Sequence, residues 1–123
     1  MYTFYKAMGF SVGDSLVEDS CLQEADSILR DAEKRGIRLL LSCDSRIVPT
    51  GLGQKISVEA DSQMHTVSNE HIPDGWMGVD IGELSLHQLK AELQDCKTII
   101  WNGELKISRR YDVIMYGLHS RWT

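Results

Sequence analysis

Apolar residues recur at helical spacing in one long stretch near the start of the 123-residue chain. Ser20 followed by Gln23 forms a capping box that predicts where this helix begins. Gly36 predicts where it ends, because glycine adopts the left-handed conformation that commonly follows a helix. The apolar face of this predicted helix contains Leu22, Ala25, Ile28, Leu29 and Ala32.

The same reasoning predicts two further helices. A second capping box, Ser85 with Gln88, indicates a helix that begins near Ser85. A short aromatic-rich segment, 2–8, reads as a helix with Gly9 as its C-terminal cap. The apolar face of the helix after Ser85 contains Leu86, Leu89 and Leu93.

Two apolar runs lack alternation, which is typical of strands buried on both faces of a parallel sheet. They are 37–41 and 98–101. The segment 45–54 carries a proline and two glycines and is expected to be a loop. Helices that alternate with buried strands predict an α/β protein, here a partial Rossmann-like parallel sheet flanked by helices in three layers. Further short strands are candidates at 55–59, 64–67 and 112–116.

The stretch "IPDGWMGVDIG", residues 72–82, follows neither a helical nor a strand period. It places three glycines and a proline among bulky apolar residues. In an α/β domain such a segment is expected to bring its backbone close to another group, because glycine permits close approach.

Composition narrows the function classes. The formal net charge is −5, and no clustered basic face points to nucleic acid. No apolar run approaches the roughly 20 residues that span a bilayer, so no membrane partner is expected. Three well-separated cysteines without a CxxC motif argue against a disulfide framework and favour a cytoplasmic protein, without excluding an organelle.

The residues alone give only weak chemical signals. Ligands of open α/β sheets bind beyond the carboxyl ends of strands, which singles out Cys43 with Asp44, and Asn102 with Gly103. The Asn102 pair also fits a hairpin turn, and both interpretations remain open. The histidine spacing matches no metal-ligand pattern, and the acidic residues Glu18 and Asp19 fit the start of a helix.

Three separated motifs resemble the phosphoglycerate kinase family. They are "TFYKAMGFSVGDSLVE" at 3–18, the stretch at 72–82, and "TIIWNG" at 98–103. Their order and spacing match that family's C-terminal, nucleotide-binding domain. The segment 31–44 also resembles a helix and strand of the family, with Ser42 in place of a proline. The resemblance covers about residues 1–103.

The resemblance implies a glycolytic phosphotransferase. This family moves a phosphoryl group between 1,3-bisphosphoglycerate and ADP, giving 3-phosphoglycerate and ATP, with Mg²⁺ as the metal. Carried over by motif, Gly78 and Val79 lie against the adenine, and Leu16 lines the same pocket. Asn102 lies near the nucleotide phosphates.

Departures from the family limit these expectations. The chain reads "WNGELKIS" where the family has a "WNGP.GVFE" pattern, so the ribose-binding glutamate has no counterpart. The "GGGDT" loop and the substrate domain also lack counterparts, so we expect no catalytic residues, no metal ligands and no activity from this chain alone. Adenine-nucleotide binding is expected to be weak or absent; the alternative is a non-catalytic interaction or structural remnant without nucleotide binding.

Residues 104–123 form a divergent tail in this interpretation. Their charge balance is +2, against −7 for residues 1–103, so the sign changes where the resemblance ends. A parallel sheet cut from a larger one exposes an edge. Either the strand-like run 112–116 covers that edge or the chain self-associates through it.

Overall fold

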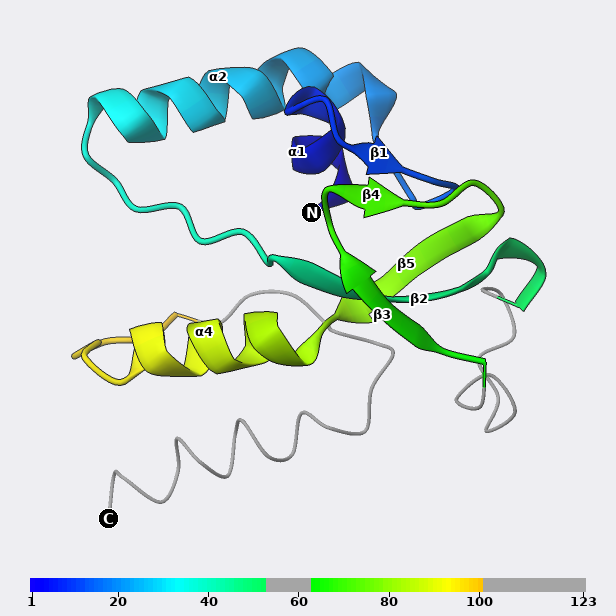
Figure 1. Cartoon of the computed structure of the whole chain (residues 1–123). Helices are drawn as coiled ribbons and strands as arrows, with labels where there is room; N and C mark the ends of the chain where they lie inside the picture. Colours follow the sequence, from blue (N-terminus) through cyan, green and yellow to red (C-terminus); the bar gives the residue numbers. More distant parts are fainter. Residues whose placement is uncertain (53–62, 101–123) are drawn as a thin grey trace.

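The computed structural model describes residues 1–52 and 63–100, which contain both helices and strands (Figure 1). The predicted α/β class is confirmed. No helix among these residues is long and apolar enough to cross a membrane. In chain order the elements are α1 (Tyr2–Ala7), β1 (Ser11–Val12), the 3₁₀ helix η1 (Asp19–Cys21), α2 (Leu22–Lys34), β2 (Asp44–Pro49), the 3₁₀ helix η2 (Thr50–Leu52), β3 (His65–Ser68), β4 (His71–Ile72), β5 (Trp76–Ile81) and α4 (Glu83–Leu93).

The strands form one parallel pair and one antiparallel sheet. β1 pairs with β4 in parallel, whereas β2 lies between β3 and β5 and is antiparallel to both. The helices α1 and α2 lie on one side of these strands and α4 lies on the other (Figure 1). The ladder between β2 and β5 shifts register because Arg46 pairs with Asp80 and the next residue, Ile47, pairs with Gly78. Val79 is therefore the extra residue of a β-bulge.

The predicted C-terminal ends of the first two helices are confirmed. Gly9 (φ 84°) and Gly36 (φ 63°) both adopt the left-handed conformation directly after a helix. In each case the amide after the glycine donates back to the last helical turn, as in a Schellman motif. After α1 the Phe10 amide donates to the Tyr5 carbonyl at 2.9 Å, and the two rings stack with centroids 6.2 Å apart.

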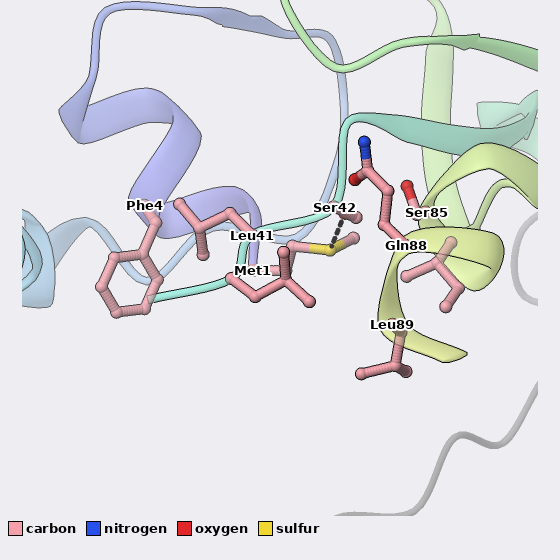
Figure 2. A pocket seen from close by; sticks show the side chains of 9 residues that line it. Met1, Phe4, Leu41, Ser42, Ser85, Gln88 and Leu89 are labelled. Carbon is pink, nitrogen blue, oxygen red and sulfur yellow. Dashed lines mark hydrogen bonds between the residues drawn. The ribbon is translucent and has the colours of Figure 1, made fainter. Parts of the chain in front are cut away.

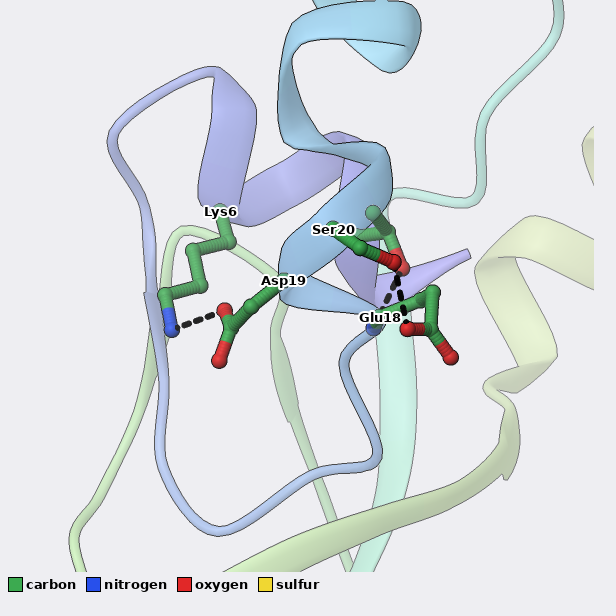
Figure 3. A network of polar contacts seen from close by, with 5 residues as sticks. Lys6, Glu18, Asp19 and Ser20 are labelled. Atoms are coloured by element: carbon green, nitrogen blue, oxygen red, sulfur yellow. Dashed lines mark hydrogen bonds and ion pairs between the residues drawn. The ribbon is translucent and has the colours of Figure 1, made fainter.

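The predicted start of α2 is wrong. The helix begins at Leu22, and Ser20 lies in the preceding η1, where it forms no capping bond. The Ser20 hydroxyl instead donates to Glu18 Oε1 at 2.7 Å (Figure 3). Beside it, Lys6 Nζ forms an ion pair with Asp19 Oδ1 at 2.7 Å, which ties α1 to η1. The acidic residues at this helix start are thus structural, as expected.

The predicted capping role of Ser85 is also wrong. Helix α4 begins at Glu83, so Ser85 is its third residue. The Asp44 carboxylate of β2 caps the helix instead, accepting from the amides of Leu84 at 3.1 Å and Ser85 at 2.8 Å. A Cβ on Gly82 would lie 2.1 Å from this carboxylate, so the cap requires glycine there.

Two predicted strands are not strands. Residues 37–41 form no strand, whereas β2 at 44–49 occupies the first half of the segment 45–54, which was expected to be a loop. Residues 98–100 also form none, and Ile100 is 91% exposed. A strand exists only where a second strand pairs with it, and among the described residues β2 has two partners while 37–41 has none.

The candidate strand at 64–67 is confirmed as β3, shifted by one residue. Two other candidates, 55–59 and 112–116, lie outside the described residues, as do Trp101, Asn102 and the tail.

The core lies where α1 packs on the strands. Its buried apolar residues come from α1, β1, β2 and β4: Tyr2, Tyr5, Val12, Ile47 and Ile72. The Tyr5 hydroxyl bonds to the Ser42 hydroxyl at 2.6 Å, and the Asn69 amide nitrogen donates to the Ser42 carbonyl at 2.8 Å. This buried polar group fixes the position of Ser42 just before β2. The predicted apolar face of α2 is less buried, because only Ala25 of that face is fully covered.

Candidate functional site

Residues 11–16 and 71–78 join along their length, and we call this contact the junction. Parallel pairing of β1 with β4 forms one end of it. The Ser11 hydroxyl donates to the Ile72 carbonyl at 3.1 Å, and the Asp14 amide donates to the Trp76 carbonyl at 2.9 Å. The junction brings together two motifs of the predicted nucleotide site, although Ser11 and Ile72 are 61 residues apart in the sequence.

Gly13 makes the close approach at the junction possible. Its φ is 51°, in the left-handed region. A Cβ at this position would lie 2.4 Å from the Pro73 carbonyl oxygen and 2.5 Å from that of Trp76. Backbone oxygens cannot move aside as a flexible side chain can, so only glycine fits.

A buried hydrogen bond at the junction joins the predicted site residue Gly78 to Ser15, which precedes the predicted site residue Leu16. The Gly78 amide donates to the Ser15 hydroxyl at 2.9 Å. Leu16 follows Ser15 and is 81% exposed. Val79 follows Gly78, is half-buried, and is the bulge residue of β5. β-Bulges are over-represented beside functional sites because they redirect a side chain.

Tyr2 occupies one side of Gly78. A Cβ on Gly78 would lie 2.0 Å from the Tyr2 hydroxyl oxygen, so the phenol ring fills the space that a larger side chain would need. The Tyr2 hydroxyl donates to the Ser45 hydroxyl at 3.1 Å. Burial raises the pKa of Tyr2 to about 12, so the phenol stays protonated at neutral pH.

The structure thus places Leu16, Gly78 and Val79 in one neighbourhood, whereas Asn102 lies outside the described residues. The arrangement offers exposed apolar surface beside a closely packed backbone, which suits a flat, uncharged ring. Sequence reasoning missed the roles of Ser15 and Tyr2, because each depends on a partner far away in the sequence. Within residues 1–52 and 63–100 no group of three or more His, Cys, Asp or Glu side chains gathers into a metal site.

A separate pocket of about 320 Å³ lies between the start of α1, the segment before β2, and α4 (Figure 2). Of the stretch 72–82 only Ile81 reaches it. The Ser42 hydroxyl bonds to the Met1 sulfur at one side, as the dashed line in Figure 2 shows. The lining is mostly apolar: Met1, Phe4, Leu40, Leu41, Ser42, Ile81, Ser85, Gln88 and Leu89.

Comparisons with known proteins agree with this fold and these motifs. The profile of the family "Phosphoglycerate kinase" matches residues 1–108. Phosphoglycerate kinase of a Nostoc species is 47% identical over 107 residues, covering 87% of this chain and 25% of the relative. That of Prochlorococcus marinus is 45% identical over 120 residues, covering 98% of this chain and 28% of the relative.

A solved structure gives the same result for the fold. Phosphoglycerate kinase from Coxiella burnetii superimposes with a TM-score of 0.74 at 24% identity, covering 89% of this chain and 26% of that one.

The α/β fold and these motifs together define the class of protein, an α/β domain of a kinase family. The chain belongs to the phosphoglycerate kinase family. It spans about a quarter of the length of the curated relatives it matches. The family match extends to residue 108, whereas the sequence motifs predicted a resemblance that ends at about residue 103.

Proposed function

We propose that this chain is the adenine-contacting part of a phosphoglycerate kinase fold. In this proposal Leu16, Gly78 and Val79 contact the base of ATP or ADP, and Asn102 lies toward the phosphates. The observation that carries it is a leucine left 81% exposed beside the buried hydrogen bond between Ser15 and Gly78. A ligand that covers an exposed leucine side chain gains about 2 kcal/mol from its burial.

Packing around Gly78 constrains how the base approaches. Tyr2 fills the side on which a Cβ would project. In this proposal the adenine approaches Gly78 from a side that Tyr2 does not fill, next to the half-buried Val79 and the exposed Leu16. Glycine at position 78 then leaves room for the Tyr2 ring and also lets the adenine approach the backbone closely.

Binding by this chain alone is weak in this proposal, with a dissociation constant on the order of millimolar. One apolar wall contributes little, and the described residues of the junction include no lysine or arginine to meet the phosphates. The reaction of the full-length family proteins is phosphoryl transfer between 1,3-bisphosphoglycerate and ADP. This reaction depends on positioning the phosphates and the metal. We propose that the chain does not catalyse it alone, because it spans a quarter of its relatives.

A thermal-unfolding series with ATP tests nucleotide binding. ATP at several times the dissociation constant raises the melting temperature by a few degrees if the site forms. Leu16→Ser abolishes the rise without disturbing the fold, because its side chain is 81% exposed. Leu84→Ser on α4, where the leucine is 65% exposed, is the matched control and keeps the rise. Substitution of Gly78 is unsuitable, because the Tyr2 ring would be displaced.

Two outcomes would contradict the proposal. A rise that survives in Leu16→Ser places the nucleotide elsewhere. No rise at millimolar ATP favours the alternative function, a non-catalytic interaction or structural remnant without nucleotide binding. A coupled assay with 3-phosphoglycerate, Mg²⁺ and ATP checks activity, and turnover near that of a full-length relative would contradict the proposed inactivity.

A cytoplasmic location is part of the same proposal. All three cysteines are free thiols, and Cys43 and Cys96 are exposed. Exposed thiols persist in a reducing compartment.

A further inference from the structure

Leu16, the exposed leucine of the proposed adenine site, is not held by hydrogen bonds of its own. It forms none with any other residue in 1–52 or 63–100, and its side chain is 81% exposed. Its position is therefore set by the residues on either side of it in the chain. The distance between Leu16 and the other predicted contacts, Gly78 and Val79, depends on which of these neighbours joins the two segments.

The residues after Leu16 do not join it to Gly78. Val17 packs against the core but is only partly buried. The Glu18 amide donates to the Thr3 hydroxyl of α1 at 3.2 Å, where water can compete for both groups. These contacts hold the chain after Leu16 against α1 and the core, and not against β5.

The residue before Leu16 joins it to β5 directly. The Ser15 hydroxyl accepts the Gly78 amide at 2.9 Å, and Ser15 is only 8% exposed. The Ser15 amide in turn donates to the Val12 carbonyl at 3.1 Å. Breaking a buried hydrogen bond of this kind leaves an amide without a partner and away from water, so the bond strongly favours the closed arrangement.

The other contacts of this turn lie at Asp14, two residues before Leu16. The Asp14 amide donates to the Trp76 carbonyl at 2.9 Å. The Asp14 carboxylate accepts from the Thr50 hydroxyl at 2.6 Å, in an exposed position where water weakens the bond. Asp14 therefore holds the start of the turn, whereas Ser15 holds the part that carries Leu16.

The bond to Ser15 also determines how a base can meet Gly78. The single amide proton of Gly78 is engaged with Ser15. A base at this position is therefore held by apolar contact with Leu16 and Val79, and not by a hydrogen bond from the Gly78 amide. Apolar contact requires both sides of the site to lie at the right separation.

We propose that Ser15 is the positioning residue of the adenine site, and this inference rests on the proposed nucleotide binding. Its hydroxyl holds the turn that carries Leu16 at a fixed distance from Gly78 and Val79, without contacting the base. When the bond is lost, the turn moves away from β5 in a fraction of the molecules. The apparent dissociation constant of the base then rises by the inverse of the fraction that stays closed.

An NMR titration of the full chain with adenosine tests this role, because adenosine carries the base without the phosphates. The amide signals of Leu16 and Val79 report binding. We expect Ser15→Ala to raise the dissociation constant at least about fivefold, the factor that one hydrogen bond typically contributes to an equilibrium. The titration is made at a temperature at which urea denaturation shows every variant to be folded.

Ser11→Ala is the matched control. It removes another serine hydroxyl that bonds across the junction, to the Ile72 carbonyl at 3.1 Å, at the end away from Leu16. Both variants lose a hydrogen bond and therefore stability, so stability alone does not separate them. The affinity does: we expect Ser11→Ala to change the dissociation constant less than about twofold, because distant sites act independently.

Hydrogen exchange in the wild-type chain supplies a second test that needs no substitution, and it decides the matter if Ser15→Ala does not fold. When the turn and β5 open together, adenosine protects the Asp14 and Gly78 amides by the same factor. At ten times the dissociation constant this factor is about tenfold. The amides of α4 should gain less protection, because they open separately.

The possible failures can be told apart. Equal affinity of Ser15→Ala and the wild-type chain overturns the positioning role and leaves the adenine site in place. Equal weakening in Ser11→Ala also overturns it, since the loss then follows the junction as a whole. Protection of the Gly78 amide without the Asp14 amide has the same meaning. If adenosine does not bind the wild-type chain, the proposed adenine site is wrong, and the role of Ser15 falls with it.

Discussion

The junction and Arg38–Leu41, which we call the open segment, are both apolar stretches of the chain. They differ in whether their backbone groups find hydrogen-bond partners among the described residues. Both are short, contain bulky apolar residues, and lie beside the core formed by α1. At the junction, backbone pairing, the Asp14 amide and the Ser15 hydroxyl each find a partner in 71–78. Along Arg38–Leu41 the described residues supply no backbone partner. Apolar character favours burial, but only a second segment at the right distance makes a strand.

The two regions therefore predict opposite responses to substitution. Residues of the junction contact fixed backbone, so a change there must displace neighbouring atoms. Residues of the open segment face water, so a change there removes few contacts in the isolated chain.

Gly13→Ala has the largest expected effect, because its Cβ would meet two carbonyl oxygens of the junction within 2.5 Å. We expect a loss of about 3 kcal/mol or more in the free energy of unfolding, measured by urea denaturation. Gly36→Ala is the control. Gly36 has a similar φ of 63° but no atom within 4 Å of its missing Cβ, so only the backbone cost of about 1 kcal/mol applies. Equal losses in the two variants would show that the junction is not closely packed.

Asp44→Ala removes the cap of α4, which lies next to the open segment. The carboxylate accepts from two helix amides and the Ser85 hydroxyl, so we expect a loss of about 2 kcal/mol. Hydrogen exchange of the first turn of α4 should accelerate more than that of α1. Asp26→Ala, which removes an exposed ion pair with Arg30, should cost less than about 0.5 kcal/mol. A similar cost for both aspartates would contradict the capping role.

Features decided by neighbours in sequence could be predicted, and features decided by distant partners could not. Gly9 and Gly36 were identified correctly as helix ends, because a left-handed glycine is a local signal. The caps at Ser20 and Ser85 were wrong, since α4 is capped by Asp44, 41 residues before Ser85. Nothing near Ser85 in the sequence indicates that a carboxylate from β2 lies there.

The aperiodic stretch 72–82 shows the same limit. Its three glycines are required for different reasons. Gly75 adopts a left-handed φ of 78°, a Cβ on Gly78 would clash with Tyr2, and a Cβ on Gly82 would clash with Asp44. Close approach of the backbone was expected, but its partners were not. The site residues Leu16, Gly78 and Val79 came from family resemblance, since their side chains carry no charge or spacing that indicates a ligand.

Tyr2→Phe tests the side of the junction that Tyr2 covers. Loss of the buried hydrogen bond to Ser45 should lower the free energy of unfolding by about 1 kcal/mol at neutral pH. The pKa of Tyr2 rises from its ordinary value of 10 to about 12 in the folded chain, chiefly through burial. Above pH 10 the unfolded chain loses this proton first, so wild-type stability falls between about pH 10 and 12.

Tyr2→Phe should flatten that alkaline fall, although Tyr5, whose pKa is also raised by burial, retains part of it. Ser45→Ala is the matched variant, because it removes the same hydrogen bond while leaving the phenol to titrate. Tyrosinate absorbance followed against pH, together with urea denaturation, separates the two variants. An unchanged alkaline fall in Tyr2→Phe would mean that Tyr2 is not buried against Gly78.

The ion pair between Arg38 and Glu92 has the smallest expected effect and tests whether the open segment is held by charge. It joins the open segment to α4 at 2.6 Å, but the two side chains are 74% and 36% exposed. Water screens such a pair, and ordering two long side chains costs entropy, so a double-mutant cycle should give a coupling below about 0.5 kcal/mol. The pair between Lys6 and Asp19, which joins elements of the closed region, should give a coupling of the same size. If the coupling of Arg38 with Glu92 exceeds about 1 kcal/mol and falls with added salt, the segment is fixed to α4 by charge. Its open edge would then be a stable feature of the isolated chain, and the contrast with the junction would lie in backbone pairing alone.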